Sequence, residues 1–325
     1  MSNYYSPLKG FTSVHQHTTS NDIQDNLIEY FDWSLLEKGN YFNSTLGELS
    51  PDSQDYSRLR PSKDVNFTGG QAWDGFRKNW IWQSGVSSSP SPIVGSNINT
   101  PGISGVYVDD VFRPTSGVGT YAHSVDYFNG RVVFDSAIPT GSKVQAEYSY
   151  KYANVIYANN VPWLREIQYS TLDVPASFSN ATKGEFKVPA EMRIQLPAIA
   201  VEIVPRRSFK GYQLGGGQYV YTDVLFHCIA EDAYTRNSLL DIVSLQNEKK
   251  IRLFDSTRLG ASGAFPIDYR GVPVPSALRY PDLIDQYQGG AARFVDATVQ
   301  GMEIINSNFT AGIARLTTEV IKTNI

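Results

Sequence analysis

The sequence predicts a β-rich α+β protein: an antiparallel sheet with flanking helices, a small inserted β-barrel or β-sandwich module, and an extended N-terminal arm. Three observations predict this class. Of the 325 residues, 13% are aromatic, and such residues suit the half-buried surface of a strand. The 26 Gly and 17 Pro residues are spread along the chain, as frequent turns between short strands require. Helical periodicity is confined to a few segments.

Residues 1–100 are predicted to form an N-terminal arm, an amphipathic helix and a loop region. The first 19 residues are polar and irregular, which indicates an extended arm. The run 83–102 is rich in Ser, Pro, Gly and Asn, which predicts a long loop. Long loops in compact proteins often form contacts with partners.

One segment of this region has clear helical periodicity. From Asp22 to Lys38, apolar residues recur every four positions, which predicts a helix with an apolar stripe. Ser20 or Asn21 is expected to cap its start, and Gly39 to end it in a left-handed conformation. The stripe consists of Ile23, Leu27, Phe31 and Leu35.

Residues 101–152 are predicted to form a small antiparallel β module. Two short strands before Pro114 are joined by a turn at Asp109-Asp110. Asn129-Gly130 separates two aromatic and β-branched runs, and this is a strong hairpin signal because a type I′ turn needs positive φ at both positions. Val144 to Tyr150 alternates as a further strand.

Residues 153–325 are predicted to form an α+β domain of sheet and helix. A strand from Ala198 is expected to end before Pro205. Asp232 is expected to cap a helix that runs to about Lys249. The remaining predictions are strands at Tyr219–Ile229, Ile251–Phe254, Asp296–Ile305 and Phe309–Ile321, and a loop at Gly260–Gln288.

Charge and cysteine content limit the function classes. The formal net charge is −4 and no stretch is strongly basic, so a sequence-independent grip on nucleic acid is not supported. A mildly acidic subunit is compatible with lining a channel through which DNA slides, because like charges prevent sticking. The single Cys228 lies in an apolar run and is expected to be buried and inert. No signal peptide or membrane helix is predicted, so we expect synthesis and folding in a cytosol.

No catalytic, cofactor or metal motif is predicted. The sequence has no phosphate-binding loop, and Gly215-Gly216-Gly217 precedes a strand, so a hairpin turn is expected there. His15 and His17 could form half of a metal site, but nothing near them completes it. His227 is expected to be a satisfied core or interface residue. Turn and helix-cap roles explain the paired carboxylates, so a non-enzymatic protein is predicted.

The aromatic excess without catalytic groups indicates protein–protein surfaces. Trp73, Trp80 and Trp82 lie close together in the sequence. Exposure of these three side chains would support carbohydrate binding, but a local core is favoured because Trp is usually buried. The candidate interface residues are Trp73, Trp80, Trp82, Tyr107, Phe112, Tyr212, Leu214, Tyr234 and Arg236.

Two stretches resemble virion proteins of tailed bacteriophages. Val125 to Tyr150 is similar to a small β module of head–tail and tail proteins. Ala198 to Phe254 has the order strand, loop, Leu-Gly-Gly-Gly turn, long strand, helix, strand, which resembles tail-terminator and neck proteins. The two stretches with their flanks cover at most about half of the chain. The chain is also about twice as long as expected for a minimal terminator.

The resemblance implies a structural subunit of the virion, assembled in the host cytoplasm. It would form a homo-oligomeric ring, with a hexamer favoured, at the neck, head–tail connector or tail terminator. Its partners would be copies of itself, neighbouring neck, tail-tube or sheath proteins, and passing DNA without sequence-specific binding. A baseplate, decoration or host-recognition protein of the same particle is the alternative. A tail-borne glycan hydrolase would need two carboxylates in a groove, and the sequence nominates none.

Overall fold

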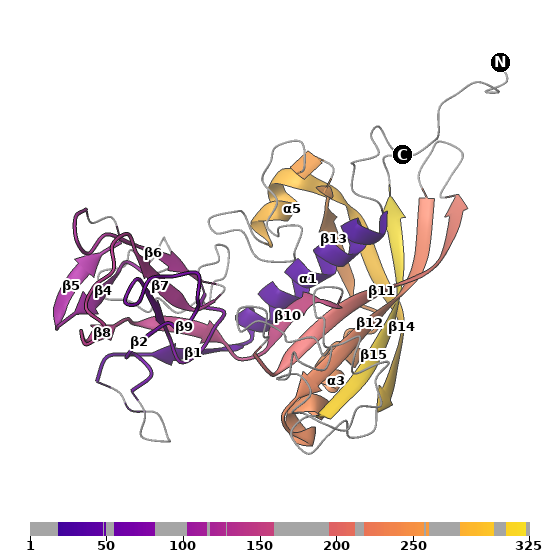
Figure 1. Ribbon diagram of the computed structural model, residues 1–325. Helices are drawn as coiled ribbons and strands as arrows, with labels where there is room; N and C mark the ends of the chain where they lie inside the picture. The colour runs from indigo at the N-terminus through magenta and orange to yellow at the C-terminus, as the bar shows by residue number, and fades with distance from the viewer. Residues whose placement is uncertain are drawn as a thin grey trace, which may run out of the picture.

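The computed structural model has a small β lobe and a large lobe built on a long sheet (Figure 1). The structure describes residues 19–47, 49, 55–81, 103–115, 118–127, 129–158, 195–211, 218–256, 258–259, 280–301 and 310–322. The predicted arm, the loop 83–102, the triple-glycine turn and most of the loop 260–288 lie outside these residues. The described fold is β-rich with few helices.

The large lobe contains a six-stranded sheet that curls like half of a barrel (Figure 1). The strand order is β10-β11-β12-β15-β14-β13. The predicted antiparallel pairing is confirmed for all neighbours except β10 and β11, which are parallel. The strands are β10 (Asn154–Tyr157), β11 (Ala198–Gly211), β12 (Gln218–Ala230), β13 (Lys250–Phe254), β14 (Gln288–Gly301) and β15 (Thr310–Lys322).

The prediction that Pro205 ends its strand is wrong. β11 continues to Gly211, and its register with β12 shifts between Ile203 and Arg207. β10 pairs only with the first four residues of β11, so Pro205 lies on a free edge. An edge strand tolerates Pro at an irregularity because no second neighbour needs the missing N–H.

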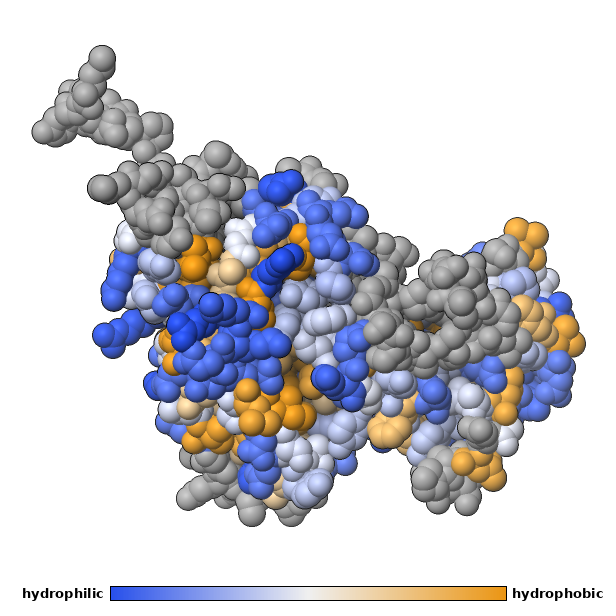
Figure 2. Space-filling model, turned by 180° about the vertical axis from the view of Figure 1, so that it is seen from behind, coloured by the Kyte–Doolittle hydropathy of each residue, from blue (hydrophilic) through white to orange (hydrophobic). Residues whose placement is uncertain are grey.

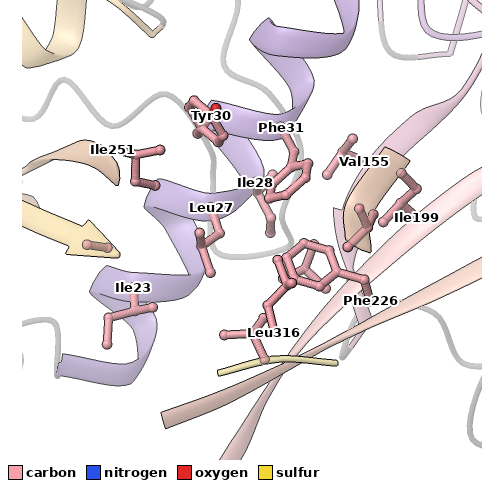
Figure 3. Close-up of a cluster of buried hydrophobic side chains, with 14 of the residues drawn as sticks. Ile23, Leu27, Ile28, Tyr30, Phe31, Val155, Ile199, Phe226, Ile251 and Leu316 are labelled. Carbon is pink, nitrogen blue, oxygen red and sulfur yellow. The ribbon is translucent and has the colours of Figure 1, made fainter. Parts of the chain in front are cut away.

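All three described helices pack on one face of this sheet. β12 presents its even-numbered residues to that face, among them Val220, Val224 and Phe226, which are buried. The predicted helix is confirmed as α1 (Thr19–Glu37), although it begins before the expected caps. Its apolar stripe packs on Phe226 and Leu316 (Figure 3). Gly39, with φ +87°, follows its end as expected.

The second predicted helix is α3 (Ala233–Ser244), and Asp232 caps it by accepting a 2.8 Å hydrogen bond from the Thr235 amide. α3 ends five residues before the predicted Lys249, because a turn with Glu248 at φ 64° leads into β13. A short helix, α5 (Asp282–Tyr287), lies where a loop was predicted. It contributes Leu283 and Ile284 to the same core.

The small lobe contains three short sheets, with strand orders β1-β9, β2-β3-β7-β6 and β5-β4-β8. The predicted turn at Asp109-Asp110 is confirmed, with positive φ at both residues. The predicted hairpin at Asn129-Gly130 is confirmed, but Asp126 pairs with Arg131, so its loop has four residues and is wider than a two-residue type I′ turn; Gly130 in it has positive φ. The predicted strand Val144–Tyr150 is two strands in different sheets. The strands are β1 (Tyr41–Ser44), β2 (Arg60–Pro61), β3 (Ala72–Asp74), β4 (Gly105–Val108), β5 (Val111–Pro114), β6 (His123–Asp126), β7 (Arg131–Phe134), β8 (Val144–Gln145) and β9 (Tyr148–Lys151).

The small lobe extends beyond the predicted module because β1, β2 and β3 come from residues 41–74. β1 pairs with β9 and β3 pairs with β7 of the later segment, while β2 pairs with β3. Residues 41–74 carry few periodic signals, since their strands are only two to four residues long. The lobe has its own core around Trp73, Trp80 and Tyr148.

α1 is buried almost all round, so its polar side chains need partners within the protein. Gln24 donates to the Val201 carbonyl of β11 at 2.7 Å. Asn26 donates to the Phe254 carbonyl of β13 and accepts from the Phe254 amide. Asp32 binds the Lys151 ammonium of β9 through both oxygens, at 2.8 and 2.7 Å.

The Asp32–Lys151 ion pair joins the two lobes and is nearly inaccessible to solvent. We expect Lys151→Met to lower the free energy of unfolding by about 3–5 kcal/mol, because it leaves a buried carboxylate without its cation. Urea denaturation measures the loss. Lys143→Met is the matched control: its ion pair with Asp110 is exposed and should be worth less than about 1 kcal/mol. Equal losses in the two variants would contradict this assignment.

Candidate assembly interface

No described helix packs on the second face of the large sheet, which we call the helix-free face. Odd-numbered residues of β12 and β15 point to it, and most of them are partly exposed. In Figure 1 α1 lies in front of the sheet, and Figure 2 shows the molecule from the other side. There the large lobe is mainly hydrophilic with separate hydrophobic patches. The face is therefore suited to water or to a polar partner.

Cross-strand polar contacts order this face. Arg315 of β15 lies 3.9 Å from the Asp223 carboxylate and 3.5 Å from that of Asp296. Thr317 donates to Asp223 at 2.6 Å. The hydrogen bond with Glu319 raises the pKa of Tyr221. Register places four carboxylates and five cations on this face. The carboxylates are those of Glu202, Asp223, Asp296 and Glu319, and the cations are those of Lys210, Lys250, Arg252, Arg293 and Arg315. Four carboxylates against five cations leave the charge of this face nearly balanced.

His227 of β12 also points to the helix-free face, and the expectation that it is satisfied is confirmed. Its side chain is buried, and Nε2 lies 2.7 Å from the Glu202 carboxylate of β11. The hydrogen bond with His227 lowers the pKa of Glu202. The pair links the two strands at the level where β10 ends.

Among the described residues, no strand covers one edge of the sheet along the second half of β11, and we call this segment the free edge of β11. Beyond Val201, no described strand pairs with the outer side of β11. This segment carries three cations, and Arg206 and Lys210 are exposed. Phe209 is 53% exposed between them. Charge, Pro205 and the register shift are features that limit indiscriminate edge pairing.

On the opposite edge, no strand of the described chain covers the second half of β14, and we call this segment the free edge of β14. β13 pairs with β14 only as far as Arg293, and no described strand pairs with the outer side of residues 296–301. This segment contains no Pro, Lys or Arg. Val299 is 46% exposed on the helix-covered side, and Asp296 is exposed on the helix-free side.

The outer side of α3 adds exposed apolar groups near this end of the sheet. Tyr234 is 84% exposed and Leu245 is 78% exposed. Leu240 on the inner side lies over Gly312, which pairs with Gly301 at the end of β14. Of the predicted interface residues on α3, Tyr234 is therefore accessible, while Arg236 is partly buried and donates to Asn237.

Trp73 and Trp80 are not accessible to a partner, so their assignment as interface residues is wrong. Both are buried in the small-lobe core, which confirms the favoured alternative of a local core. Each indole N–H donates to a nearby carbonyl, of Gly70 at 2.9 Å and of Arg77 at 2.8 Å. Partners so close along the chain satisfy the polar atoms and allow full burial. Trp82, Tyr212 and Leu214 lie outside the described residues.

Tyr107 and Phe112 lie opposite each other on the β4–β5 hairpin, with ring centroids 5.4 Å apart. Phe112 is 36% exposed, so the hairpin offers a small aromatic surface. The structure thus separates the predicted residues between the two lobes. Sequence reasoning missed Phe209 and Val299, because a strand edge is visible only once the strand order is known.

A hollow of about 340 Å³ lies on the small lobe. Tyr56 and Phe76 stack beside it, with ring centroids 3.9 Å apart. Arg58, Arg60 and Lys63 line it and are exposed. Such a surface can bind a polar or anionic group. A second hollow of about 150 Å³ lies between the lobes.

Within the described residues, no group of three or more His, Cys, Asp and Glu side chains is arranged to hold a metal ion. No helix among them is both long and apolar enough to cross a membrane. Cys228 is buried as expected, and burial raises the pKa of its thiol to about 12. No protein-family model matches the sequence, and no curated protein matches it significantly.

The lowered pKa of Glu202 predicts a pH-dependent contribution to stability. A carboxylate with a depressed pKa stabilises the fold above its ordinary value of 4.5, and this contribution is lost as pH falls through the folded-state pKa. We therefore expect Glu202→Gln to cost more unfolding free energy at pH 6 than at pH 3, measured by urea denaturation. In a His227→Asn background the difference should shrink. An unchanged pH dependence there would contradict the assigned cause.

Proposed function

We propose that this chain is a non-enzymatic structural subunit of a tailed-phage particle. In this proposal it forms a ring in the neck or tail-terminator region, joins head to tail and lets DNA pass. The observation that supports it most is the free edge on each side of the curled sheet. A sheet with two different free edges can continue from copy to copy through one repeated contact, and such a contact makes a ring when it closes.

The helix-free face supports the same proposal. Each copy in a side-by-side assembly would present this face in the same direction. A surface on which charges of both signs are interspersed and partly paired has little net attraction for the phosphate backbone. Such a face suits the wall of a channel through which DNA moves. The helices on the opposite face would then lie on the outside.

The alternative is a baseplate, decoration or host-recognition role in the same particle. Burial of Trp73 and Trp80 removes these two from the expected glycan-binding group. The hollow beside Tyr56 and Phe76 is the feature that favours this role, because partly exposed aromatic rings with charged neighbours suit a polar ligand. It does not explain the two free edges of the large sheet.

Immunogold labelling of intact particles of the encoding phage, with an antibody to this chain, tests the proposal. We expect label at the junction between head and tail. Label at the distal tip or over the capsid would overturn the neck assignment and support the alternative. Purified particles that lack the chain by mass spectrometry would overturn both virion roles.

A further inference from the structure

We infer that the free edge of β11 pairs with the free edge of β14 in a second copy of this chain, with Lys210 opposite Asp296. This deepens the proposed function by naming the partner and the contact, and it rests on that proposal only in requiring copies to join side by side. The two segments are Arg206–Gly211 and Asp296–Gly301.

The strand directions permit this contact. β11, β12, β15 and β14 are successive antiparallel neighbours, so β14 runs opposite to β11. Two copies in the same orientation therefore bring β11 of one and β14 of the next together as an antiparallel pair. Antiparallel strands form a regular ladder of N–H···O hydrogen bonds.

The side chains on both faces agree with this register. On the helix-free face, Lys210 meets Asp296 and Ser208 meets Thr298. On the helix-covered face, Phe209 would lie opposite Ala297, and Arg207 opposite Val299. If β14 of the second copy were shifted by one residue along β11, each side chain would lie opposite one that points to the other face of the sheet. A shift by two would separate the opposite charges.

Shape also fits, because the strands beside each free edge leave room for the neighbour. β10 occupies the outer side of β11 at Ala198–Val201, and β13 occupies the outer side of β14 at Gly290–Arg293. The β14 strand of the second copy would lie beside the part of β11 that β10 of the first copy leaves uncovered. The β13 strand of the second copy would lie past the C-terminal end of that β11. Neither attached strand obstructs the pair.

The register implies a stagger between copies. Val299 is level with Ala314 and Phe226 in its own sheet, whereas Arg207 is level with Thr222. Pairing Val299 with Arg207 displaces the next copy by the four residues between Thr222 and Phe226, about 13 Å at the usual strand rise. A stagger tilts the strands, and a sheet must tilt its strands to close on itself.

Disulfide trapping in the full-length chain tests the register. Ser208→Cys and Thr298→Cys in one chain place two thiols opposite each other, at a separation that a disulfide spans. The native Cys228 is buried and does not compete. Under mild oxidation at high chain concentration, we expect a ladder of covalent dimer, trimer and larger species on a non-reducing gel.

Single-cysteine variants and a mismatched pair distinguish the proposed β11–β14 contact from contacts between like edges or in another register. Each single variant should give no covalent dimer, because unlike edges meet. The pair Ser208→Cys with Gln300→Cys should cross-link several-fold less, because the two positions are one pleat apart in this register. A ladder no stronger than that of this mismatched pair, or dimers from a single variant, would overturn the inference.

Native mass spectrometry of the unmodified chain distinguishes this failure from failure of the proposed function. Rings without the expected ladder would leave the ring proposal standing and exclude this contact. A ladder without label on phage particles would support the contact and exclude the neck location. A chain that stays monomeric and forms no ladder at millimolar concentration would overturn the contact.

Discussion

The burial of α1 is the constraint on which the rest of the structure depends. A helix enclosed on all sides cannot leave its polar side chains in water, so several of them are fixed to defined atoms elsewhere in the chain. Gln24 is fixed to β11, Asn26 to β13 and Asp32 to β9. These contacts tie both ends of the curled sheet and the small lobe to one helix. Removing the partner of one of these α1 side chains therefore changes how the helix is placed against a strand or against the small lobe, in addition to the local packing.

The same arrangement explains why the large sheet can have two different faces. The helices supply apolar partners on one side, where Phe226 and Leu316 meet Phe31 and Leu27 (Figure 3). The other side needs no such partner, and ion pairs and hydroxyl groups occupy it instead. The curl and the incomplete outer strands leave the second halves of β11 and β14 without a described strand on their outer sides.

Much of this fold was predictable from local signals. The helix from Asp22, the Asp232 cap, the Asn129-Gly130 hairpin and the long central strand depend on periodicity and turn chemistry, which short windows contain. The three-residue strand β3, which contains Trp73, was not predictable, because its partner β7 lies about 60 residues further along the chain. The interface was predictable only in part. Aromatic content pointed to Trp73 and Trp80, whereas exposure depends on the tertiary core, and an edge position depends on strand order.

The chain leaves the large lobe after α1 and re-enters it at β10, and these two crossing points lie side by side. Asn40 donates to the Ala153 carbonyl at 2.7 Å and accepts from the Ala153 amide at 2.8 Å. A segment whose ends meet in this way can be gained, lost or exchanged without moving the scaffold that carries it. The small lobe has its own core, so it is a separately packed unit inserted between α1 and β10. A change in its length or loops at this crossing would leave the helix and sheet of the large lobe in place.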